Sequence, residues 1–426
     1  MPFCEISKYR QDSPSPAGAD DNGVKIFYRT YGRGPTKVLL IIGLAGTHDS
    51  WGPQMKSLAG TVIPNNETEP VDLAGDGDGI EVCAFDNRGM GQSSIPVERG
   101  QYTTTIMAKD AIALMDHLGW EKAHVFGHSM GAMISCKLAA MVPKRVLSLA
   151  LLNTTGGGYE CLPKVSLCQC SDCCTVDLPF ICCLYELPNL DRRTMSVAIR
   201  FLKAKTPEQR AAVDLDTHYT KEYLDECIGS TTRRQILYQE YVKGISSTGM
   251  QLKYGFDGQI NACWTHKVTK SDVEAIRSGG FLVSVIHGRY DIIAQIYYAR
   301  RLAEKLHPIA RMVDLHGGHL VSHERTEEVN QALAELIKAS QAGTSPEDWT
   351  NIVQERSGWL VGRKSADRKK SKEGRVAESR STSSGIFTTR LYASLVYLLS
   401  LFVLAFESMR KAHRSLRPAK VGSSLT

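Results

Sequence analysis

Short apolar runs alternate with helical stretches along most of the chain, and this alternation predicts the fold class. Strand-like runs lie at residues 24–28, 37–42, 80–85, 122–126, 146–152, 281–286 and 310–315. Helical stretches lie at residues 50–58, 103–118, 132–141, 271–277, 295–306 and 326–339. Nearly continuous apolar strands that alternate with helices are typical of a parallel sheet covered on both faces. The pattern therefore predicts an α/β protein with a mostly parallel, doubly wound sheet.

A long insertion divides this predicted core into two halves. Residues 155–268 break the alternation with helical, polar and Cys-rich sequence. In a doubly wound sheet such an insertion lies beyond the carboxyl ends of the strands, where ligands bind. We therefore expect a helical lid at 155–268, a core formed by residues 23–154 and 269–342, and a flexible N-terminal lead-in at residues 1–22.

The C-terminal region carries the basic character of the chain. From Glu355 onward 15 Lys/Arg face 5 Asp/Glu, so residues 1–354 carry −4 although the whole chain carries +6. This distribution argues against a nucleic-acid partner and favours a tail that meets an anionic surface or stays solvated. We expect a basic disordered linker at 343–390, an uncharged apolar segment at 391–406 and a basic tail at 407–426.

The apolar segment 391–406 is a candidate membrane anchor. Its sixteen residues are slightly fewer than the roughly 18 of a usual membrane span, but basic residues flank it on both sides. The alternatives are an amphipathic helix, a helix bound to a partner, or a fortuitous apolar run. We predict a protein on the cytoplasmic side that is tethered to a membrane through this segment. We also predict that it is not secreted, because residues 1–16 lack the apolar core of a secretory signal.

The chain contains 12 cysteines, and a reducing compartment would leave most of them as thiols. Seven of them fall between Cys161 and Cys183. The spacing of Cys170 and Cys173 is compatible with zinc, but no second Cys-x-x-Cys pair follows at the usual separation. S-acylation of paired cysteines is a second interpretation, and small buried residues of the lid a third. We predict neither a cofactor nor a metal site.

The motif Gly-His-Ser-Met-Gly at residues 127–131 is the strongest chemical signal in the chain. A predicted strand leads into it and a predicted helix leads out of it. This context is the one that a nucleophilic serine needs, because a sharp strand-to-helix turn exposes the hydroxyl at a helix N-terminus. Ser129 is therefore the predicted nucleophile.

A serine nucleophile needs a base and a group that orients the base. Asp291 follows the predicted strand at 281–286, and His319 follows the predicted strand at 310–315. Both lie at the carboxyl ends of strands, on the same edge of the sheet as Ser129, and in the chain order serine, acid, histidine. We predict Asp291 as the acid and His319 as the base.

Other histidines and one carboxylate compete for these roles. His316 lies close to its strand, and His323 lies near the start of the last helix. Asp314 alternates within a strand, where a carboxylate is usually exposed or satisfied. His128, next to the serine, suits packing or hydrogen bonding better than base catalysis.

An acyl-transfer transition state also needs hydrogen-bond donors for its oxyanion. The backbone N–H of Met130, directly after the serine, is one predicted donor. The loop at residues 43–46 follows the strand at 37–42, and the N–H of Leu44 is the predicted second donor.

These motifs resemble the α/β-hydrolase superfamily over residues 23–154 and 270–340. Its features occur here as the loop at 43–46, the stretch Phe-Asp-Asn-Arg-Gly-Met-Gly-Gln-Ser at 85–93, the elbow at 127–131, and the loops at 288–291 and 317–319. Within the superfamily the chain is similar to the serine-nucleophile branch of enol-lactonases and small esterases. The resemblance implies an α/β-hydrolase fold with an inserted lid.

Two departures refine the resemblance. Many relatives begin the oxyanion loop with His-Gly, whereas this chain has Ile42-Gly43, which retains the backbone donors but lacks that side chain. Epoxide hydrolases and dehalogenases carry an aspartate at the elbow, so Ser129 argues against both activities.

The sequence thus predicts a serine hydrolase that cleaves a carboxylic ester, lactone or thioester through an acyl-enzyme. The expected substrate is a small hydrophobic acyl ester or a lipid-like ester. The alternatives are an acyltransferase on the same triad, or a non-catalytic receptor or scaffold for a small ligand with the same fold.

Overall fold

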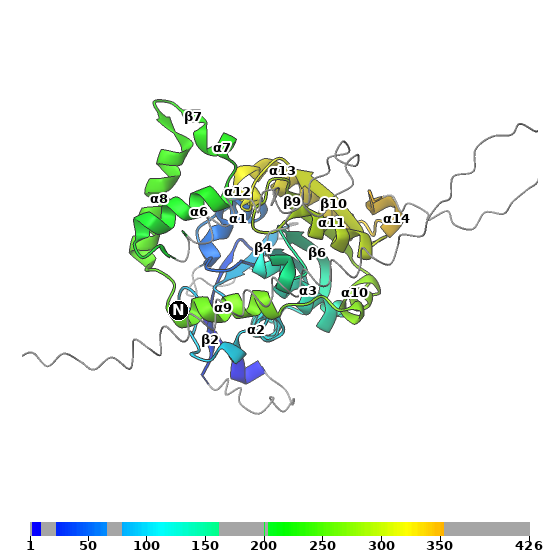
Figure 1. Cartoon of the computed structure of the whole chain (residues 1–426). Coiled ribbons are helices and arrows are strands. Elements are labelled where there is room, and N and C mark those ends of the chain that lie inside the picture. The colour runs from blue at the N-terminus through cyan, green and yellow to red at the C-terminus, as the bar shows by residue number, and fades with distance from the viewer. Residues whose placement is uncertain (1, 10–22, 66–78, 162–199, 201–202, 353–426) are drawn as a thin grey trace, which may run out of the picture. The chain divides into compact units, whose positions relative to one another are not determined.

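The computed structural model describes residues 2–9, 23–65, 79–161, 200 and 203–352. The core strands are β1 (Phe3–Glu5), β2 (Lys25–Tyr31), β3 (Thr36–Ile41), β4 (Ile80–Phe85), β5 (Ala123–His128), β6 (Val146–Leu152), β9 (Leu282–Gly288) and β10 (Ala310–Leu315). They form one eight-stranded sheet in the order β1-β2-β4-β3-β5-β6-β9-β10 (Figure 1). The strands from β4 to β10 are parallel, and β1 and β2 add two antiparallel pairings at one edge. The predicted mostly parallel, doubly wound sheet is confirmed.

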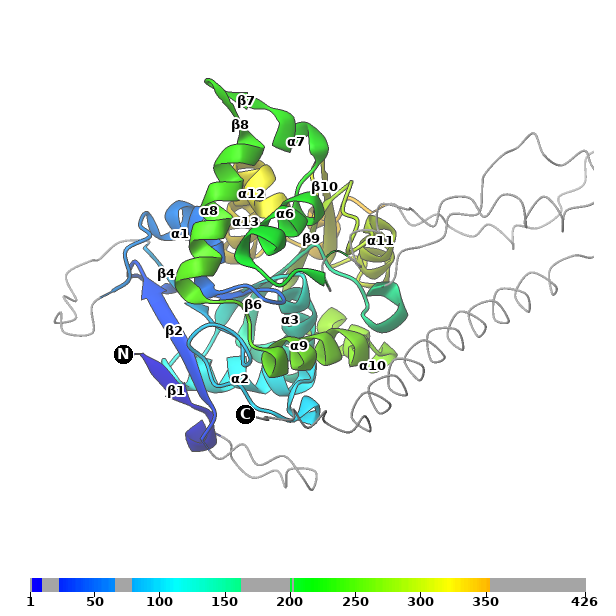
Figure 2. The same ribbon diagram turned by 60° about the vertical axis from the view of Figure 1, so that its left-hand side comes forward.

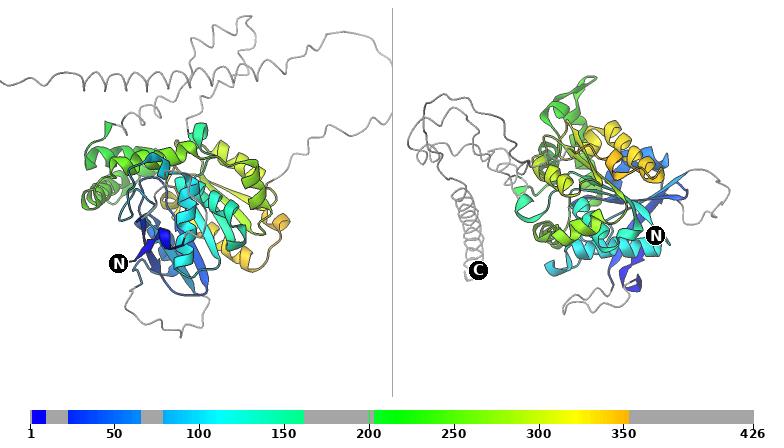
Figure 3. Two further views of the ribbon diagram at one scale, coloured as in Figure 1. Left: turned by 90° about the horizontal axis from the view of Figure 1, so that it is seen from below. Right: turned by 90° about the vertical axis from the view of Figure 1, so that its right-hand side faces the viewer.

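Helices cover both faces of the sheet. They are α1 (Gly52–Ala59), α2 (Thr104–His117), α3 (Met130–Met141), α10 (Lys270–Arg277), α11 (Ile296–Lys305), α12 (Val321–Glu324) and α13 (Thr326–Gln341). Figure 3 shows this layering of helices and sheet from two further sides. In β3, Leu39 and Ile41 pack on the side of α2, α3, α10 and α11, whereas Val38 and Leu40 pack on the side of α1 and α13. Because successive side chains of a strand point to opposite faces, burial on both faces explains why residues 38–41 of this strand are apolar without interruption.

The insertion leaves the core after β6 and rejoins it at α10. Its described elements are α6 (Pro207–His218), α7 (Lys221–Asp225), β7 (Cys227–Ile228), β8 (Thr231–Thr232), α8 (Arg233–Thr248) and α9 (Lys253–Thr265), which we call the cap (Figure 2). Thr206 caps the start of α6, and a capping box between Thr232 and Gln235 begins α8. The N–H of Leu320, in the loop after β10, donates to the carbonyl of His218 at 2.9 Å. This contact joins the end of α6 to the carboxyl edge of the sheet.

The N-terminal residues differ from the predicted flexible lead-in. Residues 3–5 form β1, which pairs with β2, and residues 6–9 form a 3-10 helix (Figure 2). Cys4 and Ile6 are fully buried in the core. The prediction is wrong for residues 3–9, because a three-residue edge strand is too short to give a periodic signal.

The segment after α13 also differs from the predicted disordered linker. A short helix, α14 (Pro346–Trp349), buries its tryptophan, whose Nε1–H donates to the carbonyl of Val283 at 2.7 Å. Asn351 exchanges two hydrogen bonds with the backbone of Met312, at 2.8 and 2.9 Å. The linker prediction is wrong for residues 345–352.

Several predictions fall outside the described residues. They concern the apolar segment 391–406, the basic tail 407–426 and most of the cysteine cluster. Within the described ranges, no helix combines the length and the hydropathy of a membrane span. The described cysteines are free: Cys4, Cys83, Cys136, Cys161, Cys227 and Cys263.

Candidate active site

Ser129 occupies the sharp turn between β5 and α3. Its backbone has φ +54° and ψ −120°, a left-handed conformation that is strained for any residue other than glycine. The flanking glycines make the turn possible: a Cβ at Gly131 would lie 2.0 Å from the carbonyl oxygen of Ile41, and one at Gly127 would lie 2.4 Å from that of Gly131. The carbonyl of Ser129 then accepts the first helical hydrogen bonds of α3. The hydroxyl is therefore held at a helix N-terminus.

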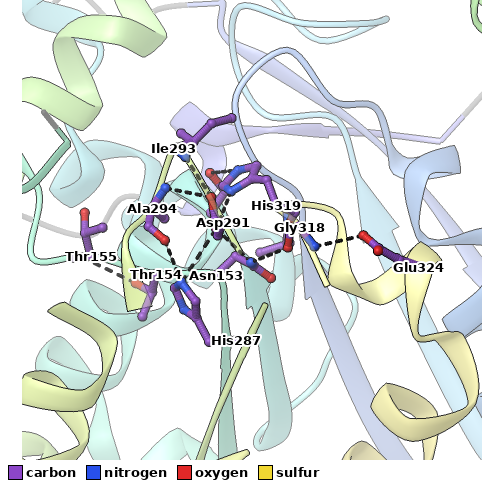
Figure 4. A network of polar contacts seen from close by, with 12 residues as sticks. Asn153, Thr154, Thr155, His287, Asp291, Ile293, Ala294, Gly318, His319 and Glu324 are labelled. Carbon is purple, nitrogen blue, oxygen red and sulfur yellow. Dashed lines mark hydrogen bonds and ion pairs between the residues drawn. The ribbon is translucent and has the colours of Figure 1, made fainter. Parts of the chain in front are cut away.

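The structure brings together the three residues predicted as nucleophile, acid and base. Ser129 Oγ lies 3.0 Å from Nε2 of His319. Nδ1 of His319 lies 2.8 Å from Oδ2 of Asp291, and Figure 4 shows these two side chains facing each other. Asp291 and His319 are buried, whereas Ser129 is half-buried. The hydroxyl can thus donate to His319, which donates in turn to Asp291, while the serine remains partly accessible.

The carboxylate of Asp291 is satisfied on both oxygens. Oδ1 accepts the backbone N–H groups of Ile293 and Ala294 at 2.8 and 2.9 Å. Oδ2 accepts from the amide of Asn153 at 2.8 Å as well as from His319. Four donors around one buried carboxylate stabilise its ionised form and fix its orientation.

These neighbours decide the protonation state of the acid. Burial by itself would raise the pKa of Asp291, but the charge and hydrogen bond of His319, together with His287 and Asn153, lower that pKa to about 2. His287 is fully buried behind the carboxylate, 3.6 Å from Oδ2. Asp291 is therefore ionised at neutral pH and holds the proton of His319 on Nδ1.

Two further residues of this network did not emerge from the sequence. Asn153 is fully buried with φ +49°, and it donates to the carbonyl of Gly318 at 3.1 Å in addition to Asp291 (Figure 4). Glu324 accepts the N–H of Gly318 at 2.8 Å and the hydroxyl of Thr220 from the cap. Asn153 could have been identified from the sequence, since it is polar and directly follows an apolar strand. Glu324 has no such local signal.

The two predicted oxyanion donors lie on either side of the nucleophile. Met130 begins α3 directly after Ser129, and Leu44 lies in the loop after β3. This loop is close to the serine, since a Cβ at Gly43 would lie 3.0 Å from the Cβ of Ser129. In the part of the chain that the structure describes, neither the N–H of Leu44 nor that of Met130 has an acceptor. Among the described residues, the hydrogen-bonding capacity of both amides is therefore unused.

The Phe-Asp-Asn-Arg-Gly-Met-Gly-Gln-Ser stretch at residues 85–93 supports the backbone around this site. The amide of Asn87 donates to the carbonyl of Ile42 at 2.7 Å, at the start of the oxyanion loop. Arg88 forms two 2.6 Å hydrogen bonds with Asp110, and both side chains are buried. The residues that make this motif specific therefore hold the backbone in place.

The rival candidates for the acid and the base make other contacts. His316 is exposed, and His323 hydrogen-bonds to the carbonyl of Ser50 at 2.7 Å. Asp314 forms ion pairs with two surface arginines. His128, as predicted, makes a hydrogen bond, donating through Nε2 to the carbonyl of His319 at 2.8 Å.

His319 is flanked by two other imidazole rings. The ring of His128 lies 5.0 Å away, and that of His218, at the end of α6, stacks on it at 6.1 Å. Burial, reinforced by His319, lowers the pKa of His128 to about 3 and places the pKa of His218 well below its usual value. Nδ1 of His218 lies 3.5 Å from the hydroxyl of Tyr241. Both neighbouring rings are therefore neutral at pH 7 and add no positive charge beside His319.

Comparisons with known proteins agree with this fold. The α/β hydrolase fold family model matches residues 37–171. The dihydrolipoyllysine-residue acetyltransferase component of the acetoin cleaving system of Cupriavidus necator is 37% identical to this chain over 140 residues. The match covers 33% of this chain and 32% of that protein. The putative carbamate hydrolase RutD of Azorhizobium caulinodans is 32% identical over 128 residues, 30% of this chain and 40% of that protein. The matched part thus covers well under half the length of these curated relatives.

Solved structures cover more of the chain. The enol-lactonase from Burkholderia xenovorans LB400 superposes with a TM-score of 0.53 at 20% identity, covering 74% of this chain and 98% of that one. The putative non-heme bromoperoxidase BpoC from Mycobacterium tuberculosis H37Rv gives a TM-score of 0.51 at 22% identity, covering 74% and 96%. These matches show that the chain has the α/β-hydrolase fold, as its motifs predicted.

Proposed function

We propose that the chain is a serine hydrolase that cleaves a carboxylic ester, lactone or thioester through an acyl-enzyme on Ser129. The observation that carries the proposal is the continuous hydrogen-bonded path from Ser129 Oγ through His319 to Asp291, with distances of 3.0 and 2.8 Å. A serine hydroxyl is a weak nucleophile at neutral pH and needs such a base. Asp291 keeps the proton of His319 on Nδ1, so that Nε2 is free to take the proton of the serine.

The reaction then follows from these positions. Ser129 Oγ bonds to the carbonyl carbon while His319 Nε2 takes its proton, and the N–H groups of Leu44 and Met130 stabilise the oxyanion. Collapse of the tetrahedral intermediate breaks the bond to the alcohol or thiol, which leaves with the proton from His319. Water next attacks the acyl-enzyme with His319 as base, and release of the acid returns the proton to Ser129.

The cap supports a hydrophobic acyl ester or a lipid-like ester as substrate. Leu215, Tyr219 and Leu224 form a buried apolar cluster in the cap, and Leu320, next to His319, packs against it. A cap whose interior next to His319 is apolar favours a hydrophobic ligand over a charged one. The ester, lactone and thioester classes share the same acyl chemistry, so an activity screen with short-chain esters, long-chain esters, lactones and thioesters is the experiment that separates them.

Acyl transfer to an alcohol or thiol is the second candidate. The observation in its favour is the 37% identity to a protein named as an acetyltransferase component. The acyl-enzyme would be the same, with an alcohol or thiol in the place of water. Product analysis in the presence of competing alcohols tests this alternative, because a transferase forms the new ester in preference to the free acid.

The central test uses a fluorophosphonate probe, which reacts with activated serines. We expect the probe to label the wild type but not Ser129→Ala, while the exposed Ser271→Ala is labelled like the wild type. A well-folded wild type that is not labelled would contradict the proposal. If a small hydrophobic ligand then raised the melting temperature without being turned over, a non-catalytic receptor of the same fold would be the better description.

Membrane tethering is a separate proposal that rests on sequence alone. The uncharged segment 391–406 and its basic flanks support an anchor that keeps the enzyme near lipid-like substrates. A fluorescent-protein fusion of residues 386–426 should stay with the membranes after carbonate extraction. A fully soluble fusion would exclude this anchor.

A further inference from the structure

Gln259, in the middle of helix α9, is a cap residue whose amide reaches the oxyanion loop of the core. The side chain is fully buried. Its Oε1 accepts the N–H of Ala45 at 2.9 Å, and its Nε2 donates to the carbonyl of Arg88 at 3.0 Å. A backbone donor and a backbone acceptor dictate which end of the amide is oxygen, so the orientation is unambiguous. One buried cap side chain therefore ties together the loop after β3 and the loop after β4.

Gln251, at the start of the same segment, completes the link. Its Nε2 donates to Oε1 of Gln259 at 2.9 Å and to the carbonyl of Gly89 at 2.9 Å. Both glutamines therefore contact the backbone of the core, and each oxygen or nitrogen of Gln259 has a partner. A buried polar group that is fully paired rigidifies its surroundings, whereas removing one partner leaves an unsatisfied buried group, which is destabilising.

The consequence concerns the N–H of Leu44, the proposed oxyanion donor. Ala45, directly after it, has φ +59°, a conformation that is strained for a non-glycine residue and needs support from neighbours. The carbonyl of Gly43 accepts the N–H of Gly46 at 3.4 Å. In a trans peptide the carbonyl and the next N–H point in opposite directions. The peptide before Leu44 is thus held by Gly46 and the peptide after it by Gln259.

We propose that Gln259 is a positioning residue that sets the oxyanion hole from the cap. By holding the N–H of Ala45, it fixes the loop conformation in which the N–H of Leu44 is free and directed toward the substrate carbonyl. The oxyanion hole is then fully formed only when α9 is packed against the core. Displacement of α9 therefore weakens the oxyanion hole, while the hydrogen bonds among Ser129, His319 and Asp291 remain. This inference rests on the proposed acyl chemistry at Ser129.

A merely structural role for Gln259 makes a different prediction. Asn261, on the same helix, also fastens α9 to the core, donating to the carbonyls of Arg99 at 3.2 Å and Tyr102 at 3.1 Å. Neither contact involves the oxyanion loop. If Gln259 only fastened α9 to the core, replacing Gln259 and replacing Asn261 would have the same effect on catalysis.

The test compares Gln259→Met with Asn261→Leu in the full chain, because each replacement keeps the approximate shape of the side chain and removes its hydrogen bonds. With a p-nitrophenyl ester, we expect Gln259→Met to lower kcat about 10-fold to 100-fold with KM within about twofold, approaching the effect of deleting an oxyanion donor. Asn261→Leu should leave both constants within about twofold of the wild type. Equal kcat in Gln259→Met and wild type, or an equal loss in both variants, would overturn the inference.

A second readout does not depend on turnover. Amide hydrogen exchange in a peptide covering residues 43–50 should become faster in Gln259→Met than in the wild type and should be unchanged in Asn261→Leu. Unchanged exchange in Gln259→Met would contradict the positioning role even if activity fell. Failure of the proposed function is recognised separately, since the wild type itself would then neither hydrolyse the ester nor react with a fluorophosphonate.

Discussion

The amide of Asn153 donates a 2.8 Å hydrogen bond to Asp291, on the same carboxylate oxygen that accepts the proton of His319. Asn153 directly follows β6, so the end of a central strand orients the acid that follows β9. The left-handed backbone at Asn153 suits this role, because asparagine tolerates positive φ better than most residues. The acid is thus held by its own loop and by a neighbouring strand end.

Removing this amide should impair the proposed chemistry more than the fold. Asn153→Gly keeps the left-handed backbone accessible. A hydrogen bond to a charged group contributes about 1.5–3 kcal/mol, so we expect kcat/KM to fall by roughly 10-fold or more. Steady-state kinetics with the best ester, alongside thermal unfolding, measure both effects. Unchanged kcat/KM would show that the loop around Asp291 orients the acid without Asn153.

The buried pair of Arg88 and Asp110 should be important for stability. Both side chains are buried, and their two hydrogen bonds are 2.6 Å long. Asp110→Ala leaves the guanidinium without its counter-ion, so we expect the free energy of unfolding to fall by about 3–5 kcal/mol. The double variant Arg88→Met, Asp110→Leu removes both charges and should be more stable than Asp110→Ala in urea titrations. A double variant that is less stable than Asp110→Ala would contradict this account.

Buried histidines should make the fold sensitive to mild acid. Burial lowers the pKa of His124 from about 6.5 to about 4. Between these values the unfolded chain binds a proton there and the folded chain does not, so stability falls as the pH falls. His124→Asn removes this term, and its free energy of unfolding should decline less steeply, by up to about 1.4 kcal/mol per pH unit. Urea titrations between pH 6.5 and 4 measure the slopes, and equal slopes would contradict the prediction.

Trp349 should stabilise the core although it lies beyond the last long helix. It is buried, donates to the carbonyl of Val283 at 2.7 Å, and has the guanidinium of Arg311 above its ring. We expect Trp349→Ala to lower the free energy of unfolding by about 3–5 kcal/mol. Trp264→Ala is the matched control, because Trp264 is about half exposed. A similar loss in both variants would mean that burial at α14 is not the cause.

The sequence by itself determined those features whose signal is local. The predicted bounds of β4, β6 and β10 agree with the structure to the residue. For β6 the reason is burial on both faces, which makes this strand a nearly continuous apolar run. The elbow around Ser129 is a strand, a turn and a helix in succession. Asp291 and His319 could be predicted because each follows a strand, and parallel strands end on one edge of the sheet.

Only the tertiary structure decided which distant residues support these groups. Asn153 meets Asp291 across 138 positions, and Gln259 meets Ala45 across 214. Nothing in the neighbourhood of Gln259 distinguishes it from any other polar residue of the insertion, and the short elements β1 and α14 are too small to carry a periodic pattern. The hydrophobic periodicity of one segment shows only which of its faces is buried in the core and which is exposed to solvent. Which side chains of two such segments then meet depends on how the whole chain packs, and that is a property of the assembled sheet and cap.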